Sequence, residues 1–143
     1  MSDGRAYIEF RGWKGNLGYI KLIFDSGYIF LKIYRCLKFL YGYSILRPLV
    51  KILSWFYCRI YSCEISLNAR IEGAVIFPHP IGIVIGDGVI LNGINVIYQN
   101  VTLGQNKKSY PVLSACIIYP NSVIAGGGEY ECEIFGALSR VVV

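Results

Sequence analysis

Apolar residues recur every six positions through the middle of this 143-residue chain. An α-helix repeats its apolar positions every three to four residues and a β-strand every two, so a period of six fits neither element alone. It is typical of a parallel β-helix, in which each coil buries its apolar wall only when the next coil stacks on it. The repeat therefore predicts a mainly β chain, a parallel β-helix of hexapeptide turns over residues 63–143. The recurring positions are Ile65, Ile71, Phe77, Ile85, Leu91, Ile97 and Leu103.

The repeat breaks between Phe77 and Ile85, where the step grows by two residues. The break has the sequence FPHPIG over residues 77–82 and holds His79, the only histidine of the chain. The prolines on both sides of this histidine each lock φ and remove a backbone donor, which favours a fixed loop. We therefore expect the chemistry of the chain at this break. A second irregularity shortens the step to five residues within residues 113–118.

Composition limits the class of protein. Hydrophobic residues make up 55% of the chain and charged residues 16%, which excludes a disordered chain. The surplus of apolar surface predicts an oligomer or a membrane contact in addition to a core. Five cysteines form an odd number without a CxxC pair, so we expect reduced thiols and no disulfide scaffold. One histidine is too few for the common zinc sites, so we expect no metal. Charged residues interrupt the first eleven positions, which argues against a signal peptide and predicts a cytoplasmic protein.

Residues 1–62 differ from the rest of the chain in charge and in pattern. They hold ten of the fourteen lysines and arginines but only three of the nine acidic residues. Their apolar residues recur at helical spacing from residue 17 to residue 60. We therefore expect a basic, apolar helical segment, divided into two or three helices at Gly27 and Pro48.

Lys32, Arg35 and Lys38 fall within one arc of about 120° when residues are placed at 100° intervals around a helix. Three interpretations of the basic segment stay open. It packs on the β-helix or on sister subunits, it contacts an anionic membrane surface, or it binds nucleic acid. We disfavour nucleic acid because no recognised binding motif accompanies the charge. A peripheral membrane contact through residues 17–60 would place the cytoplasmic protein at the inner face of the membrane.

Residues 64–104 resemble the serine acetyltransferase branch of the hexapeptide-repeat acyltransferases. The resemblance is carried by IFPHPIGIVIG at residues 76–86 and by IYQNVTLG at residues 97–104. It implies a left-handed parallel β-helix, a homotrimer, and active sites in the clefts between neighbouring subunits, with acetyl-CoA as co-substrate. It also places the family's catalytic histidine at His79 and its carboxylate partner at Glu64.

The residue types fit acyl transfer from a thioester to a hydroxyl. A hydroxyl is a poor nucleophile at neutral pH, so a base must remove its proton during the attack. The imidazole of His79 suits that role, and the carboxylate of Glu64 would fix its tautomer and stabilise the imidazolium. Backbone N–H groups in the glycine-rich turns could hold the oxyanion, and direct transfer from acetyl-CoA needs no covalent enzyme intermediate. The alternatives are a structural histidine fixed between prolines and a solvated glutamate at the mouth of the first coil.

Two departures from the family pattern concern the acceptor. Serine acetyltransferases have an aspartate before the catalytic histidine, where it would meet the ammonium group of serine, and here that position is Pro78. The family's Asp-Arg-His-Pro motif matches residues 108–111, where Lys108, Ser109 and Tyr110 replace the first three residues. A site without these charges would bind free serine poorly, because the ends of the zwitterion would lose water without gaining partners. We therefore expect a saccharide hydroxyl as acceptor, as in short relatives encoded with polysaccharide biosynthesis.

The remaining predictions concern binding residues and the C-terminal coil. Beyond Gly128 the repeat is poorly phased, and the chain reaches Val143 without the closing coil of the family. This predicts a truncated last coil with an exposed β edge.

Serine O-acetyltransferase is the alternative function, and a non-catalytic or decayed trimeric hexapeptide-repeat protein is the second alternative. The residues expected to face the sugar are Tyr98, Gln99, Asn100 and Tyr110, and those expected to line the acetyl-CoA groove are Val101, Thr102, Gly104, Ala125 and Gly126.

Overall fold

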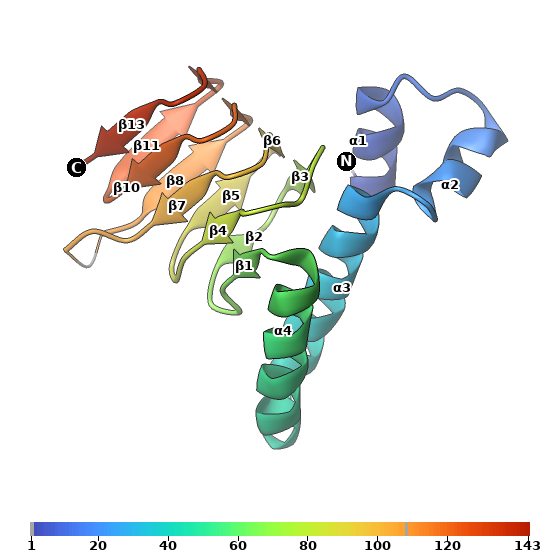
Figure 1. The fold of residues 1–143 in the computed structure, drawn as a ribbon, viewed down its shortest axis with the longest axis horizontal. Helices are drawn as coiled ribbons and strands as arrows, with labels where there is room; N and C mark the ends of the chain where they lie inside the picture. The colour runs from blue at the N-terminus through green and yellow to red at the C-terminus, as the bar shows by residue number, and fades with distance from the viewer. Residues whose placement is uncertain (1, 108) are drawn as a thin grey trace.

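The structure of the chain, a computed structural model, describes residues 2–107 and 109–143. A helical N-terminal part lies against one end of a three-sided parallel β-helix (Figure 1). The helices are α1 (Asp3–Phe10), α2 (Asn16–Leu22), α3 (Ser26–Tyr41), the 3₁₀ turn η1 (Ser44–Leu46) and α4 (Arg47–Tyr61).

Each coil of the β-helix contributes one strand to each of three parallel sheets. The first sheet has the strand order β1-β4-β7-β10-β13, the second β11-β8-β5-β2 and the third β12-β9-β6-β3. Strands β1 to β12 thus form four coils, and β13 begins another. This confirms the parallel β-helix predicted from the six-residue repeat. The strands are β1 (Glu64–Ile65), β2 (Arg70–Ile71), β3 (Ala74–Ile76), β4 (Val84–Ile85), β5 (Ile90–Asn92), β6 (Ile94–Ile97), β7 (Thr102–Gly104), β8 (Pro111–Ser114), β9 (Ile117–Ile118), β10 (Val123–Ala125), β11 (Gly128–Glu131), β12 (Ile134–Phe135) and β13 (Arg140–Val142).

The residues of the six-residue repeat stack in columns inside the prism. In the first sheet Ile65 pairs with Ile85, Ile85 with Leu103, and Leu103 with Ile124. All four side chains are buried inside the prism, where each packs against its neighbours in the column. Burying an aliphatic side chain of this size stabilises a fold by roughly 1.5–3 kcal/mol. The columns are therefore the main source of stability of the β-helix.

The two additional residues of the first break lie at the corner between β3 and β4. Ile76 pairs with Val96, and Val84 pairs with Thr102. The chain from Ile76 to Val84 therefore has two more residues than the matching stretch of the second coil. The corner that carries His79 bulges outward from an otherwise regular wall.

The five-residue step is compensated by a buried side chain from the coil below. The third coil is one residue short at the corner between β8 and β9. There Oδ1 of Asn95 accepts a hydrogen bond from the N–H of Cys116 (2.9 Å), and its Nδ2 donates to the carbonyl of Asn92 (2.6 Å). Asn95 is fully buried, so these bonds supply the partners that its amide needs.

The helix boundaries predicted at Gly27 and Pro48 are both found, since each residue is the second of a helix, Gly27 in α3 and Pro48 in α4. Pro48 lies in the first turn of α4, where its missing N–H costs no hydrogen bond. The carboxylate of Asp25, the residue before α3, accepts a 2.9 Å hydrogen bond from the N–H of Tyr28 and caps that helix. Glycine is required at position 27, because a Cβ there would overlap the carbonyl oxygen of Phe77.

Helix α3 lies across the open end of the first coil and supplies donors to its carbonyl groups (Figure 1). Arg35 donates hydrogen bonds to the carbonyls of Ile71 (3.2 Å) and Gly73 (2.7 Å), and Lys38 donates to that of Ala69 (2.9 Å). Buried carbonyls at the end of a β-helix need such partners. Of the three interpretations of the basic arc, packing on the β-helix is therefore correct for these two residues.

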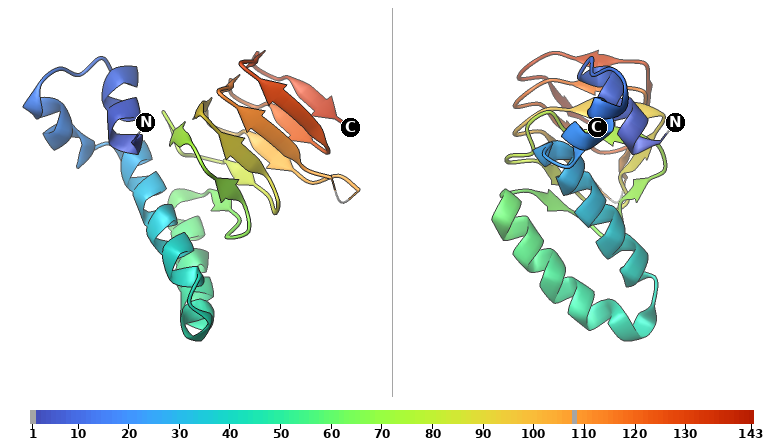
Figure 2. Two further views of the ribbon diagram at one scale, coloured as in Figure 1. Left: turned by 180° about the vertical axis from the view of Figure 1, so that it is seen from behind. Right: turned by 90° about the vertical axis from the view of Figure 1, so that its right-hand side faces the viewer.

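Helix α4 packs on α3 with one face and leaves the opposite face uncovered. The ring of Tyr57 stacks on that of Phe30 at a centroid distance of 5.0 Å, and its hydroxyl donates to the Phe30 carbonyl (3.0 Å). Figure 2 shows the α3–α4 pair projecting beyond the outline of the β-helix. No helix within the described residues is long and apolar enough to cross a bilayer.

Candidate functional site

His79 lies on the corner between β3 and β4 with its side chain exposed, while the flanking prolines are buried. The backbone before it is fixed by α1. The N–H of Phe77 donates a 2.7 Å hydrogen bond to the hydroxyl of Tyr7, whose side chain is fully buried. Burial raises the pKa of the Tyr7 hydroxyl, so it stays protonated over the physiological range. The imidazole is therefore open to solvent on a firmly seated backbone.

Arg11 fixes the same loop from the end of α1. Its guanidinium donates a hydrogen bond to the carbonyl of Pro78 (3.2 Å) and forms an ion pair with Asp25 (2.9 Å). Asp25 is 8% exposed and also caps α3. One guanidinium thus connects the end of α1, the start of α3 and the loop that carries His79.

The corner that carries His79 is one of four stacked corners, each of which has one residue in the left-handed region of φ and ψ. Gly82, Asn100, Asn121 and Leu138 have φ values of +65°, +56°, +62° and +64°. The amide Nδ2 of Asn100 donates to Oδ1 of Asn121 (3.1 Å). A Cβ at Gly82 would overlap Oδ1 of Asn100, so the conformation and the space both require glycine there. Asparagine side chains therefore occupy this column in the second and third coils.

Three of the four predicted acceptor residues lie at this corner. Tyr98, Gln99 and Asn100 follow β6, one coil above His79. Oε1 of Gln99 is buried and has no hydrogen-bond partner among the described residues. Tyr110 lies apart from them, against the corner between β4 and β5. Within one chain the structure therefore separates Tyr110 from the other three.

Glu64 lies on β1 with its side chain exposed, directly opposite Val84 of β4. Its N–H donates a 2.7 Å hydrogen bond to the carbonyl of Ile83, which ties it to the strand that leaves the His79 loop. Among the described residues no hydrogen bond or ion pair joins the Glu64 carboxylate to the His79 imidazole. Their pairing remains a prediction.

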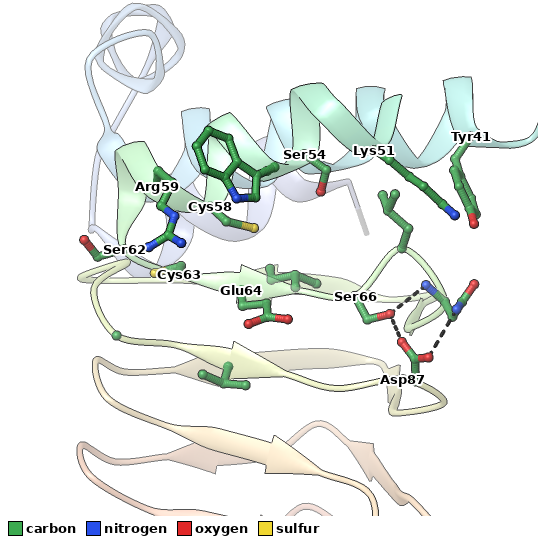
Figure 3. Close-up of a pocket in the computed structure, with 16 residues that line it drawn as sticks. Tyr41, Lys51, Ser54, Cys58, Arg59, Ser62, Cys63, Glu64, Ser66 and Asp87 are labelled. Atoms are coloured by element: carbon green, nitrogen blue, oxygen red, sulfur yellow. Dashed lines mark hydrogen bonds between the residues drawn. The ribbon is translucent and has the colours of Figure 1, made fainter. Parts of the chain in front are cut away.

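The Glu64 carboxylate lines a groove of about 750 Å³ between α4 and the first two coils (Figure 3). Helix α4 contributes Lys51, Trp55 and Arg59 to one wall, and the β-helix contributes Glu64 and Asp87 to the other. Neither Lys51 nor Arg59 forms an ion pair with a described residue. The groove is of the size of small-molecule sites, ~300–1,000 Å³, and its two walls carry opposite charge.

Side-chain hydrogen bonds tune the acidic wall of the groove. Ser66 and Asn68 donate to the carboxylate of Asp87, which lowers the pKa of that carboxyl and keeps it ionised. Burial raises the pKa of the Cys58 and Cys63 thiols at the back of the groove. A thiol is nucleophilic as thiolate, so neither cysteine is suited to nucleophilic catalysis. Chemistry in the groove would therefore depend on side chains other than these two thiols.

The predicted acetyl-CoA residues lie mainly on the first sheet. Gly104 of β7 pairs with Ala125 of β10, and the N–H of Gly126 donates to the Gly104 carbonyl (3.1 Å). No atom lies within 4 Å of a Cβ placed on Gly104, so the surface there is open. Thr102 is half-buried on the same strand. The side chain of Val101 is fully buried in the prism and cannot line a surface groove.

Sequence reasoning did not predict two parts of the site. The α4 wall of the groove depends on how the helices dock, and the contact between Arg11 and Pro78 joins residues 67 positions apart. No local pattern indicates either. Lys108, which replaces a family residue, lies outside the described residues. Among residues 2–107 and 109–143 no group of three or more His, Cys, Asp or Glu side chains could hold a metal ion.

Comparison with known proteins identifies the fold. No protein-family model matches the sequence, and no curated protein sequence does. Serine acetyltransferase from Brucella abortus strain S19 superposes with a TM-score of 0.82 over 97% of this chain, at 19% identity. Serine acetyltransferase from Vibrio cholerae superposes with a TM-score of 0.80 over 96% of this chain, at 24% identity. The fold of this chain is that of the serine acetyltransferases.

The serine acetyltransferase fold extends over the helical part as well as the β-helix. Soybean serine acetyltransferase, solved in complex with serine, superposes with a TM-score of 0.72 over 99% of this chain, at 21% identity. The left-handed β-helix with N-terminal helices is thereby confirmed. The chain spans 60%, 55% and 64% of the Brucella, Vibrio and soybean enzymes, respectively.

Proposed function

We propose that this chain is an acetyl-CoA-dependent O-acetyltransferase that acetylates a hydroxyl group of a saccharide. The observation that carries the proposal is the only histidine, His79, exposed on a fixed corner of a β-helix with the serine acetyltransferase fold. The imidazole is the general base, and Glu64 orients it and stabilises its protonated form.

The proposed reaction is one direct transfer. Acetyl-CoA supplies the acetyl group as a thioester. His79 takes the proton of the acceptor hydroxyl while the hydroxyl oxygen bonds to the carbonyl carbon. The carbon–sulfur bond then breaks, and the imidazolium returns the proton to the leaving sulfur. The surface proposed to hold the thioester substrate lies along Gly104, Ala125 and Gly126, where the backbone is open at Gly104.

The saccharide acceptor is proposed from the side chains around the corner. Pro78 and Tyr110 occupy positions where serine acetyltransferases have charged residues for the amino acid. Tyr98, Gln99 and Asn100 instead offer an aromatic face and amide groups, which are side chains that can contact a sugar ring and hydrogen-bond to its hydroxyls. Serine is the alternative acceptor, which the same assay detects.

The proposal includes a cytoplasmic homotrimer with active sites between neighbouring subunits. Apolar side chains exposed on the sheets, Val84 on β4 and Ile94 on β6, fit such a contact. It also includes peripheral contact with the inner face of the membrane through residues 17–60.

A product mass spectrum tests the function. Purified protein is incubated with acetyl-CoA, L-serine and a pool of nucleotide sugars and oligosaccharides. His79→Ala should lower turnover by about 10²- to 10⁴-fold, the usual contribution of a general base. Ile81→Ala is the matched control, because Ile81 is 61% exposed in the same loop, and it should retain activity.

Each outcome has a distinct meaning. A saccharide that gains one acetyl group with wild type but not with His79→Ala supports the proposal. O-Acetylserine as the sole product would establish the alternative acceptor. Unchanged turnover in His79→Ala would contradict the assignment of the base. Absence of both product and acetyl-CoA binding would favour the non-catalytic alternative, whereas binding without product would leave the acceptor to be identified.

Glu64→Gln tests the carboxylate partner. The amide keeps the shape of the side chain but cannot stabilise the imidazolium, so turnover should fall by less than in His79→Ala. Glu72→Gln, the same change at an exposed glutamate of the first coil that does not line the groove, is the control. A loss as large as that of His79→Ala would give Glu64 a more direct role in the reaction.

A further inference from the structure

We infer that the outer face of α4, formed by Leu49, Ile52, Leu53, Phe56 and Ile60, docks onto an anionic lipid surface. The inference deepens the membrane contact of the proposed function, because it names the docking face and the lipid class. Its test does not use catalytic activity, so the failure of one does not imply the failure of the other.

The outer face of α4 is continuous and apolar. Its five side chains are 54%, 56%, 42%, 54% and 77% exposed in chain order. At 100° per residue they fall within an arc of about 100°, next to the side on which Val50 and Tyr57 are buried. An uncovered apolar stripe of this kind marks a contact with a membrane or another protein.

Charge distinguishes lipid from other occupants. Residues 26–63 contain six lysines and arginines and no aspartate or glutamate. Lys51, Trp55 and Arg59 lie along one margin of the apolar arc, and the Arg59 guanidinium is 5.4 Å from the centre of the Trp55 ring. An apolar face bordered by cations and a tryptophan is typical of a helix lying in the surface of an anionic membrane.

A second copy of the chain fits this face less well. Pairing α4 with α4 through a twofold axis would bring the cations of both copies together, while the acids Glu64 and Asp87 lie on the other wall of the groove. The acidic residues Glu129, Glu131 and Glu133 lie in the last full coil, at the end of the β-helix away from α4 (Figure 1). A contact between α4 and that coil would be head-to-tail and would favour open chains of molecules over a closed assembly.

The docking face borders the candidate site. A shallow apolar hollow of about 430 Å³ lies between Lys51, Ile52, Trp55 and Phe56. Lys51 and Trp55 also line the groove that contains Glu64. Docking through α4 would therefore bring the mouth of that groove to the lipid headgroups. The acceptor class that fits this arrangement is a saccharide attached to a membrane lipid.

Vesicle flotation of the full chain tests the inference. Vesicles of phosphatidylcholine alone are compared with vesicles containing about one third phosphatidylglycerol. We expect wild type to float only with the anionic vesicles. Phe56→Glu, which places a charge in the centre of the docking face, should lower binding about tenfold or more. Ile134→Glu is the matched control, because Ile134 is 68% exposed on the β-helix, and it should bind as wild type does.

Two further measurements keep the result interpretable. Lys51→Gln should weaken binding about fivefold, as expected for one cation near an anionic surface. In Trp13→Phe, Trp55 is the only tryptophan left, and its fluorescence should shift to shorter wavelength on adding anionic vesicles.

Three results would overturn the inference. They are equal binding to both vesicle types, no binding to either, and wild-type binding by Phe56→Glu. Light scattering without lipid adds a fourth, because dissociation of an oligomer by Phe56→Glu would show that a second copy covers the face. Acetylation of a soluble saccharide without vesicle binding would overturn only this inference.

Discussion

Arg11 links parts of the molecule that lie far apart in the sequence, and none of its contacts is to the reacting groups. It fixes the Pro78 carbonyl next to His79 and is fixed in turn by the capping carboxylate Asp25. We regard it as a positioning residue. Arg11→Ala frees the loop backbone, so the imidazole is retained but no longer held in position.

We expect Arg11→Ala to lower kcat about tenfold with little change in the KM for acetyl-CoA, because a displaced base costs proton transfer and not thioester binding. Arg11→Lys should recover part of the loss, since an ammonium can still pair with Asp25. Arg5→Ala is the control, because Arg5 is exposed on the same helix. An unchanged kcat in Arg11→Ala would contradict the positioning role.

Three buried tyrosines make stability depend on alkaline pH. Burial raises the pKa of Tyr7, Tyr34 and Tyr57 above the ordinary value of 10.0. The unfolded chain therefore releases these protons near pH 10 while the folded chain keeps them, so stability that is fully present below pH 10 is lost above it. Burial lowers the pKa of Lys38, which acts in the opposite direction but is a single group.

The free energy of unfolding in urea should therefore fall as pH rises above 10, and the phenolate absorbance of these three tyrosines should appear only with unfolding. Tyr57→Phe should reduce the slope. A slope that is unchanged in this variant would mean that the hydroxyl of Tyr57 does not contribute.

At the scale of elements, the sequence predicted the β-helix better than the helices. Its columns depend on local spacing, and the buried stack of Ile65, Ile85 and Leu103 follows directly from the six-residue repeat. Pro48 marks a helix start through its own backbone chemistry. Gly27 also lies at a helix start, but its small size serves a contact with Phe77, fifty residues away, which no local pattern reveals.

The cap formed by α3 is the contact between elements that costs most to remove. Arg35→Ala would leave the carbonyls of Ile71 and Gly73 without donors and the buried Asp3 carboxylate without its 2.7 Å partner. We expect a loss of about 2–4 kcal/mol in the free energy of unfolding. Urea denaturation measures it. Lys14→Ala, at an exposed position, should change stability by less than about 0.5 kcal/mol.

If Arg35→Ala lowered the free energy of unfolding by less than the about 0.5 kcal/mol allowed for the control, water would replace the guanidinium at the end of the first coil. Helix α3 would then cover the first coil without stabilising it through these hydrogen bonds.

At the scale of the whole molecule, some residues of the candidate site can be identified from the sequence and others only from the way the helices dock. His79 stands out because it interrupts a regular pattern. The wall of α4 does not, because Lys51 and Arg59 become groove residues only once the helical pair has docked. Spacing indicated that the basic arc of α3 shared one face but not that this face would meet carbonyl groups.

Stacked coils that contact only their neighbours should open from the less covered end. In these 143 residues α3 covers the first coil, whereas β13 pairs with β10 alone among the described strands. Hydrogen exchange followed by mass spectrometry should therefore show amide protection that falls from β1 toward β13. Equal protection in all coils would mean that the β-helix opens as one cooperative unit.

The position of the cap in the chain has a consequence for biosynthesis. The ribosome makes α3 and α4 before any strand of the β-helix, so the surface on which the first coil must be laid exists when that coil emerges. Each later coil can then pair with a coil that is already folded, and an incomplete chain has unpaired strands at only one end of the β-helix. Moving the helices to the C-terminus by circular permutation would reverse that order, and the nascent coils would wait with both ends open.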